Sequence, residues 1–300
     1  MRSTILDGKL VAKEIENNVR ERVYDYEDNY DDSITLATII VGDNKASKTY
    51  VKMKSKACRR VGIRTREYSL PEFTTEGLIT LIQMLNEDPE INGILIQHPL
   101  PKTIDEQKCF DVIATEKDVD GLSSHSFGKM SFKEESFGAA TPKGIINILD
   151  FYNIKLEGKK VCVVGRSQIL GKPMALMLLN RDATVTVCHS KTKNLKDEIK
   201  SSDIVIAALG KPEYIKKDWL KEGVILIDAG YNYVNGKSVG DAENPEGIAS
   251  FYTPVPGGVG PVTIATLLEN TITAAEKQKE LIQTKEIKGK QYIKGEVKWK

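Results

Sequence analysis

The stretch KVCVVGRSQILGKP, which spans residues 160–173, decides the fold class of this chain. It begins with mostly β-branched residues, turns between Gly165 and Gly171, and continues into the apolar residues 174–179, which are typical of a helix. A strand, a glycine turn and a helix in this order are expected to present free backbone N–H groups and the positive end of a helix dipole to an anion. The stretch predicts a phosphate-binding turn. A plain tight turn is the alternative, because the glycines do not follow the usual G-x-G-x-x-G spacing.

Strands and helices alternate along the rest of the chain. Short apolar runs predict strands at residues 34–42, 63–69, 93–97, 160–165, 184–188, 203–208 and 224–228. Apolar residues at helical spacing predict helices near residues 11–23, 46–61, 75–86 and 261–283. Alternation of this kind predicts an α/β protein with parallel sheets.

The turn-rich residues 131–142 separate two rounds of this alternation, so we expect two domains. The first, residues 1–140, is expected to be an α/β catalytic domain for the substrate, completed by residues 265–283 of a last helix that crosses back to it. The second, residues 141–264, is expected to be a Rossmann-like domain that binds a dinucleotide. The Lys-rich residues 284–300 are expected to form a solvated tail rather than a nucleic-acid patch.

The composition favours a small-molecule substrate. The chain has 300 residues, 40% of them hydrophobic, which is enough for a large core and about two domains. Its 43 basic and 42 acidic residues lack the basic bias of a dedicated nucleic-acid binder. Its apolar runs are far shorter than the ~20 residues of a membrane helix, and no signal-peptide core is visible at the N-terminus. We therefore expect a cytoplasmic protein with no nucleic-acid or membrane partner.

The cysteines are scattered along the chain. The four of them, Cys58, Cys109, Cys162 and Cys188, form no CxxC pair. This spacing argues against a zinc site and against a secreted disulfide framework. We expect a reducing compartment and no metal.

The end of the second strand after the glycine turn bears on the choice of dinucleotide. NAD-preferring folds carry an acidic residue there, about 20 residues after the glycines, which binds the ribose hydroxyls. Here the sequence runs from Cys188 through His189 and Ser190 to Lys191 and Lys193, without an acid. Hydroxyl and cationic groups, with Arg166 nearby, would attract a ribose phosphate, so we predict NADP over NAD. Ordinary solvated charge is the alternative for the two lysines.

Tyr50 and Lys54 lie four residues apart in a helical segment, so their side chains share one helix face. A planar substrate can stack on the tyrosine, and a partly desolvated lysine can exchange protons near neutral pH. The alternative is an ordinary pair on an exposed helix surface.

Three further segments carry polar or glycine-rich groups at positions suited to a ligand. Gln97 ends an apolar strand, where ligands bind in α/β sheets. Asp118 and Asp120 offer loop carboxylates that can accept hydrogen bonds from an aminopyrimidine edge, or alternatively cap the turn at Gly121. Residues 253–263 are rich in glycine and proline and would admit close approach of a ligand, or serve only as a connector.

Together these segments resemble the methylenetetrahydrofolate dehydrogenase/methenyltetrahydrofolate cyclohydrolase family. The resemblance covers nearly the whole chain and follows the family's order. Its motifs lie at residues 47–54, 93–97, 117–121, 141–144, 165–167, 171–173 and 256–263.

The resemblance implies a role for individual residues. Lys54 would transfer protons, Gln97 would tune Lys54, Tyr50 would stack on the folate, and Asp120 would bind the pterin. The folate pocket would be lined by Pro256, Gly257, Gly258 and Val259. The cofactor would be held by Gly165, Arg166, Ser167, Gly171, His189 and Ser190.

The resemblance also implies an activity. The chain would oxidise methylenetetrahydrofolate with NADP and hydrolyse the methenyl product to formyltetrahydrofolate, in the one-carbon metabolism that serves purine biosynthesis. Hydride transfer assisted by an adjacent nitrogen lone pair requires alignment more than an acid or a base. A homodimer formed through the cofactor domains is implied as well.

The chain departs from the family pattern at three places. His98 stands where Leu is usual, Ala140 replaces Cys, and Ala229 replaces Val. Because His98 adjoins the tuning glutamine, it could alter the local charge and weaken hydrolysis, or it could simply point away from the substrate. The alternatives to the bifunctional enzyme are a dehydrogenase with little cyclohydrolase activity, a dehydrogenase for another substrate and a non-catalytic dinucleotide-binding protein.

Overall fold

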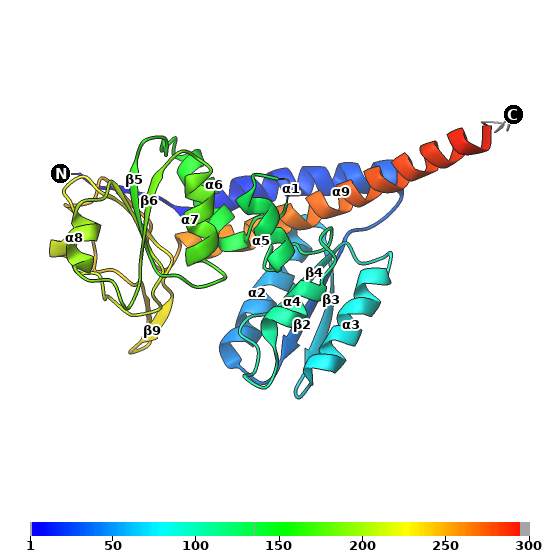
Figure 1. Ribbon diagram of the computed structural model, residues 1–300, viewed down its shortest axis with the longest axis horizontal. Helices are drawn as coiled ribbons and strands as arrows, with labels where there is room; N and C mark the ends of the chain where they lie inside the picture. Colours follow the sequence, from blue (N-terminus) through cyan, green and yellow to red (C-terminus); the bar gives the residue numbers. More distant parts are fainter. Residues whose placement is uncertain (1, 135, 295–300) are drawn as a thin grey trace, which may run out of the picture. The chain divides into compact units, whose positions relative to one another are not determined.

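The structure is a computed structural model that describes residues 2–134 and 136–294 (Figure 1). The chain forms two compact units. Unit 1 comprises Met1–Asn18 and Asp120–Leu268, and unit 2 comprises Val19–Val119 and Glu269–Lys300. Helices α1 (Gly8–Tyr30) and α9 (Val259–Lys294) both begin in unit 1 and end in unit 2. The expected return of the last helix to the first part of the chain is therefore confirmed.

Unit 1 is built on a parallel sheet of six strands in the order β1-β11-β8-β7-β5-β6. The strands are β1 (Thr4–Ile5), β5 (Lys160–Val164), β6 (Thr184–Cys188), β7 (Ile204–Ala207), β8 (Ile225–Asp228) and β11 (Phe251–Tyr252). The four longer strands were predicted from the sequence, whereas β1 and β11 were not. Pairing of β1 with β11 explains why the first residues belong to unit 1.

Both faces of the inner strands β5, β7 and β8 are buried, which is why these strands are apolar without alternation. Val161 and Val163 pack in one cluster with residues of helices α6 and α7, and Cys162 and Val164 pack in another with Ile199 of α8. Figure 1 shows α6 and α7 on one side of β5 and β6, and α8 on the other. The helices of this unit are α5 (Ser124–Ser131), α6 (Ala140–Phe151), α7 (Gly171–Leu179), α8 (Leu195–Lys200) and the 3-10 turn η1 (Lys217–Trp219).

An antiparallel hairpin follows the sheet strand β8. It consists of β9 (Asn232–Val234) and β10 (Lys237–Val239). Its aromatic residues face solvent, with Tyr231 exposed by 62% and Tyr233 by 74%.

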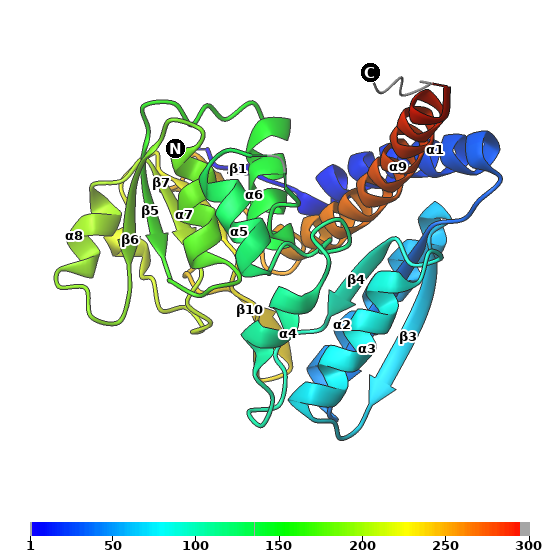
Figure 2. The same cartoon turned by 45° about the vertical axis from the view of Figure 1, so that its right-hand side comes forward.

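Unit 2 contains a parallel sheet of three strands in the order β3-β2-β4. The strands are β2 (Thr35–Val41), β3 (Arg64–Leu70) and β4 (Gly93–Ile96). The helices are α2 (Lys45–Val61), α3 (Thr75–Glu87) and α4 (Glu106–Val112), and Figure 2 shows α2 and α3 running beside the sheet. Every residue of the central strand β2 is buried, as its sequence predicts.

The second halves of α1 and α9 pack together within unit 2. The Arg22 guanidinium donates to the Glu276 carboxylate at 2.5 Å and to Thr273 Oγ1 at 2.8 Å. Lys279 Nζ lies 2.7 Å from the Asp32 carboxylate. Helix α9 is longer than predicted, because it continues to Lys294 through polar residues with good helix propensity. Residues 284–294 of the predicted tail thus continue the helix, and residues 295–300 lie outside the described part of the chain.

The two units divide the chain differently from the predicted domains. Residues 1–18 and 120–140 were expected in the first domain, but they belong to unit 1 with the six-stranded sheet. Asn180 Nδ2, just after α7, donates to the Met130 carbonyl at 2.8 Å, which holds α5 in unit 1. The turn-rich residues 131–142 were expected to separate the two domains, and α6 begins within them, at Ala140. No helix among the described residues is long and apolar enough to span a membrane.

Both sheets contain a topological switch point. This is the place beside a strand where the order of the strands reverses, so that one connection runs to the neighbour on one side and another runs to the neighbour on the other side. In unit 1, β5 lies between β6 and β7, and in unit 2, β2 lies between β3 and β4. Ligands of open parallel sheets bind at such points, outside the carboxyl ends of the strands. Each unit therefore offers one preferred place for a ligand.

Candidate active site and cofactor site

Helix α2 carries the buried lysine of unit 2. Asn44 caps the helix, because its side-chain oxygen accepts from the N–H groups of Ala46 at 2.9 Å and Ser47 at 3.1 Å. The helix ends at Gly62, whose φ of 91° suits a left-handed cap. Lys54 lies on the inward face and is only 7% exposed. An amine buried to this extent has lost most of its hydration, and burial favours its neutral form.

Gln97 meets Lys54 at the carboxyl end of β4. Lys54 Nζ donates to Gln97 Oε1 at 3.1 Å. The backbone N–H of Gln97 donates to the Ile39 carbonyl at 2.8 Å, which continues the pairing of β4 with β2 beyond the strand. The Gln97 side chain is therefore positioned by the sheet, and the predicted pairing of the lysine with the glutamine is present in unit 2.

Tyr50 lies one helical turn before Lys54 and is half-buried. The two side chains share one face of α2, as their spacing predicts. An aromatic ring beside a desolvated amine can stack on a planar substrate while the amine exchanges protons.

His98 follows Gln97 and contacts helix α4. Its Nδ1 lies 2.8 Å from Glu106 Oε1 and 2.9 Å from Glu106 Oε2. Glu106 Oε1 also accepts the N–H of Leu100 at 2.9 Å. Partial burial raises the pKa of Glu106, but the hydrogen bonds from His98 and Leu100 outweigh it and hold that pKa below its usual range. Glu106 is thus a carboxylate at neutral pH, and sequence analysis did not identify it.

Lys117, the first residue of the segment 117–121, stabilises the end of helix α3. Lys117 Nζ donates to the carbonyls of Leu85, Asn86 and Asp88 at the end of α3. Burial lowers the pKa of Lys117, and these carbonyls satisfy its hydrogens. Asp118 is buried in unit 2, whereas Asp120 is half-buried and begins the second segment of unit 1. The structure therefore assigns Asp120 and Lys54 to different units.

The glycine turn of unit 1 lies at the switch point of the six-stranded sheet. Gly165 directly follows β5, has a φ of 139°, and donates its N–H to the Cys188 carbonyl at 2.9 Å. A Cβ on Gly165 would lie 2.9 Å from the carbonyl carbon of Ala208, just after β7. A Cβ on Gly171 would lie 2.5 Å from the carbonyl carbon of Gly165. The two glycines let three backbone segments approach at the carboxyl ends of β5 and β7.

Two backbone N–H groups of this turn form hydrogen bonds within the protein. The N–H groups of Leu170 and Gly171, at the start of α7, are not free, because both donate to Ser167 Oγ at 3.2 and 3.3 Å. The hydroxyl of Ser167 thus closes the turn. These two hydrogen bonds are long, so an anion could exchange with the hydroxyl at little cost.

The ends of β5 and β6 present the groups expected to bind a ribose phosphate. Arg166 follows β5 and Ser190 follows β6, and both side chains are exposed. His189 is half-buried and its Nδ1 accepts the N–H of Lys191 at 3.2 Å. No acidic residue occurs from Cys188 to Lys193. A cationic, acid-free rim beside a close glycine turn fits a phosphorylated dinucleotide such as NADP.

The glycine- and proline-rich loop before α9 belongs to unit 1. Pro256 is exposed and Gly257 is half-buried with a φ of 108°, whereas Gly258 and Val259 are buried. A Cβ on Gly258 would lie 2.6 Å from the Pro254 carbonyl oxygen. Pro256 and Gly257 are therefore the accessible members of this loop, and Val259 packs in the core.

Unit 1 contains two buried carboxylates, Asp228 and Asp241, whose structural role the sequence did not predict. Asp228 at the end of β8 accepts the N–H groups of Gly230, Asp241 and Ala242 at 2.9 to 3.0 Å. Burial raises the pKa of Asp228 to about 6, against the effect of these donors.

Asp241 is fully buried and holds the loop after β7. Its carboxylate accepts the N–H groups of Leu209 at 2.5 Å, Gly210 at 2.8 Å and Lys211 at 2.8 Å, and Asn232 Nδ2 at 2.9 Å. This loop borders the glycine turn, because Ala208 contacts the position of Gly165. The buried carboxylates thus shape the backbone around the candidate cofactor site.

Both parts of the chain match known protein families. Residues 6–120 match the family described as "Tetrahydrofolate dehydrogenase/cyclohydrolase, catalytic domain". Residues 139–279 match "Tetrahydrofolate dehydrogenase/cyclohydrolase, NAD(P)-binding domain". The "Bifunctional protein FolD" of Acidobacterium capsulatum is 54% identical over 282 residues, which cover 92% of this chain and 99% of the relative.

Solved structures lead to the same family. A bifunctional FolD methylenetetrahydrofolate dehydrogenase/cyclohydrolase from Campylobacter jejuni aligns with a TM-score of 0.90 and 43% identity, covering 92% of this chain and 99% of the other. A methylenetetrahydrofolate dehydrogenase-cyclohydrolase (FolD) from Trypanosoma brucei, complexed with NADP cofactor and inhibitor, aligns with a TM-score of 0.89 and 36% identity, covering 93% and 99%. The chain belongs to the tetrahydrofolate dehydrogenase/cyclohydrolase family.

Proposed function

We propose that this chain oxidises methylenetetrahydrofolate with NADP and hydrolyses the methenyl product to formyltetrahydrofolate. The observation that carries the proposal is the buried amine of Lys54, hydrogen-bonded to Gln97 at 3.1 Å, in a chain whose two halves match both domains of the family. A dehydrogenase for another substrate would leave this buried pair without a purpose. A non-catalytic dinucleotide-binding protein would have no use for it either.

In the first reaction, alignment is the main contribution of the protein. NADP, when bound, accepts the hydride from the methylene carbon of the folate. Gly165, Gly171 and Ser167 would hold the pyrophosphate, and His189 would border the adenosine part. Arg166 and Ser190 would bind the ribose phosphate and so favour NADP over NAD. No proton has to move at the reacting carbon in this step.

In the second reaction, Lys54 acts as the base. Water attacks the methenyl carbon while the neutral amine of Lys54 takes one of its protons. One carbon–nitrogen bond of the ring then breaks, the leaving nitrogen takes the proton back from Lys54, and loss of the hydroxyl proton to solvent leaves the formyl group on the other nitrogen. Burial favours the neutral amine, whereas the Gln97 carbonyl oxygen favours the ammonium form. The two effects act on the same amine in opposite directions.

The remaining family residues would bind the folate. Tyr50 would stack on its aromatic part, and Asp120 would accept hydrogen bonds from the aminopyrimidine edge of the pterin. Pro256 and Gly257 would contact the substrate, while the buried Gly258 and Val259 would hold their loop in shape.

A homodimer formed through the cofactor-binding parts is also proposed. The β9–β10 hairpin supports it, because Tyr231, Tyr233 and Val234 leave a cluster of exposed aromatic and apolar surface on unit 1. Light scattering on the purified protein should give twice the mass of the chain, and Tyr233→Glu should shift it toward the monomer. A cytoplasmic location is supported by the cysteines, which are all free and buried.

One assay tests the function. The purified protein is mixed with methylenetetrahydrofolate and either NADP or NAD, reduced cofactor is followed, and methenyl and formyl products are separated. Reduction of NADP with formyl product formed faster than in enzyme-free controls is expected. Accumulation of the methenyl product would indicate a dehydrogenase alone, and no reduction with either dinucleotide would refute the folate assignment.

A further inference from the structure

The amide of Gln97 can face Lys54 in two ways. An amide has an acceptor oxygen and a donor nitrogen of nearly the same size, so only its hydrogen-bond partners determine which one faces the lysine. In unit 2 the oxygen faces Lys54, and Gln97 Nε2 donates to the backbone carbonyl of His98 at 2.7 Å. The His98 carbonyl can only accept, so it selects this orientation.

The peptide after Gln97 lies beyond the hydrogen-bonded part of the sheet. Gln97 itself still pairs with Ile39 of β2, but Pro99 has no N–H to contribute. The carboxylate of Glu106 contacts this segment on both sides of the proline, through the His98 ring and through the N–H of Leu100.

We propose that Glu106 is a positioning residue for the cyclohydrolase reaction. By holding His98 and Leu100, it fixes the His98 carbonyl, which orients the Gln97 amide with its oxygen toward Lys54. This inference rests on the proposed function, because it concerns how Lys54 is set for proton transfer. His98 then serves through its ring contact and its carbonyl, without touching the substrate.

Glu106 is itself well anchored. It stands in the first turn of α4, which Asp105 caps by accepting the N–H of Lys108 at 3.1 Å. The backbone N–H of Asp105 donates in turn to Thr75 Oγ1 at 3.0 Å, at the start of α3. The position of the carboxylate is thus determined by two helices of unit 2, independently of the loop that it holds.

Loss of this contact would act on proton transfer. If the His98 carbonyl turns away, the Gln97 amide can rotate and present its N–H groups to Lys54. A donor facing the amine disfavours the ammonium form, so the amine would no longer retain the proton that it takes from water. Hydride transfer needs no proton at this amine and should be affected far less.

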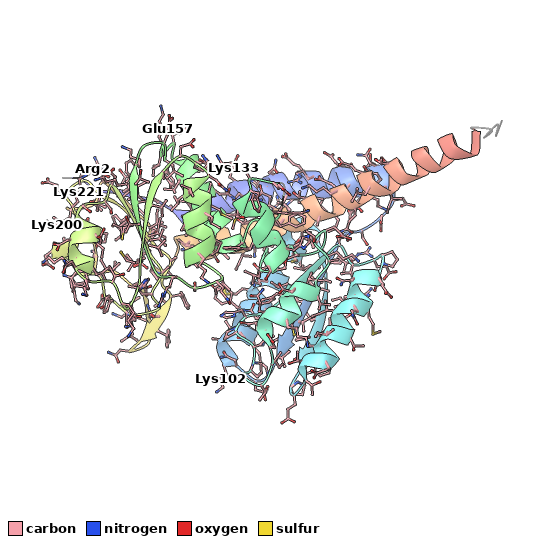
Figure 3. All side chains as sticks on the ribbon, in the orientation of Figure 1. Arg2, Lys102, Lys133, Glu157, Lys200 and Lys221 are labelled. Carbon is pink, nitrogen blue, oxygen red and sulfur yellow. The ribbon has the colours of Figure 1, made fainter. Side chains whose placement is uncertain are left out.

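The test compares three variants in both reactions. Glu106→Ala should lower the kcat of methenyl hydrolysis about tenfold, a fraction of what general base catalysis contributes, with KM changed less than about twofold. Glu106→Gln should restore most of the rate, because Oε1 contacts both the His98 ring and the Leu100 N–H, and an amide oxygen in its place can keep both contacts while only the contact of Oε2 with the ring is lost. Lys102→Ala is the control, since Lys102 is exposed and projects outward from the same loop (Figure 3).

A double-variant cycle distinguishes positioning from general loosening of the fold. In a Gln97→Ala background, Glu106→Ala should cost less than about twofold, because the amide that it orients is gone. Equal losses of hydrolysis and hydride transfer, or a full additional loss in the Gln97→Ala background, would overturn the proposal.

If Glu106→Ala does not fold, His98→Leu takes its place, because it removes the ring contact and leaves the contact to Leu100. A loss of about threefold, confined to hydrolysis, is expected from that smaller change. Unchanged hydrolysis in His98→Leu would then overturn the proposal. Failure of the wild type to reduce NADP would instead refute the proposed function, so the two results are distinguishable.

Discussion

The two switch points of this molecule share a topology and differ in chemistry. In unit 1 the strand β5 ends in a turn made of backbone, where Gly165 and Gly171 permit close approach and the flanking side chains Arg166 and Ser190 are exposed. In unit 2 the corresponding place is occupied by a buried amine, with Lys54 only 7% exposed. The first arrangement suits recognition of a large anion, and the second suits transfer of a single proton.

The polar groups at the two switch points differ in burial, and this difference suits one of them to binding and the other to catalysis. A phosphate keeps part of its hydration and is best met by exposed cations and backbone dipoles. A proton-transfer group must lose hydration so that both of its protonation states are accessible near neutral pH. Substitutions at one switch point should therefore affect mainly the role that the burial of its groups indicates.

Lys54→Met is expected to have the largest effect. It replaces the buried amine with an apolar side chain of similar length, so hydrolysis should fall about a thousandfold while hydride transfer survives within about tenfold. Both activities are measured separately, by methenyl disappearance and by NADP reduction. Lys56→Met is the control, because Lys56 lies on the exposed face of the same helix. Full retention of both activities in Lys54→Met would remove Lys54 from the mechanism.

Asp228 is the buried ionisable residue of unit 1 that we compare with Lys54, and its role is to hold the surrounding backbone in place. Burial raises the pKa of Asp228 to about 6, above its unfolded value, so the folded state binds the proton more tightly. Stability should therefore fall as pH rises from about 4 to about 6, by about 2–3 kcal/mol, and stay level above that range. Asp228→Asn should remove this part of the slope in urea unfolding measured at pH 4.5 and pH 7. An identical slope in the variant would show that Asp228 does not titrate in this range.

Gly165→Ala tests the backbone nature of the cofactor turn. The added Cβ would meet the Ala208 carbonyl, and the φ of 139° is unfavourable for alanine. A strain of about 1–3 kcal/mol should raise the KM for NADP by roughly thirtyfold. Hydrolysis of added methenyltetrahydrofolate should change little. Gly158→Ala is a matched control, since Gly158 also has a positive φ of 72° but has open space around it, so an equal effect there would contradict a local collision.

The sequence predicts the long elements of both sheets and misses the short ones, for a physical reason. Strands such as β2 and β5 are covered on both faces, so they read as continuous apolar runs. Helix α5, in contrast, has a mixed sequence and depends on Ser123, whose side chain accepts the N–H of Ser126 at 3.1 Å. Two-residue strands such as β1 form only because a distant partner is present.

The candidate sites divide in the same way. Tyr50, Lys54 and Gln97 could be found from the sequence because helix spacing and strand ends place them. Glu106 and Asp241 could not, because their partners are backbone N–H groups whose positions depend on loop conformation. Local pattern thus locates the candidate reacting groups, whereas the groups that hold them become visible only in the folded structure.

Arg166→Ala is expected to have the smallest effect, and it tests which residues of unit 1 bind the ribose phosphate. If the rim of the glycine turn recognises a ribose phosphate, loss of one charge-assisted hydrogen bond should reduce the preference for NADP over NAD about tenfold, with the rate on NAD unchanged. Because Arg166 is exposed, the preference should also weaken as ionic strength rises in the wild type and much less in the variant.

Lys193→Ala should change the preference for NADP over NAD less than about twofold if that lysine is ordinary solvated charge. An unchanged preference in Arg166→Ala, combined with a large change in Lys193→Ala, would move the phosphate site from β5 to the turn after β6. The exposed rim of unit 1 would then still bind the cofactor by charge, but through the strand at the sheet edge.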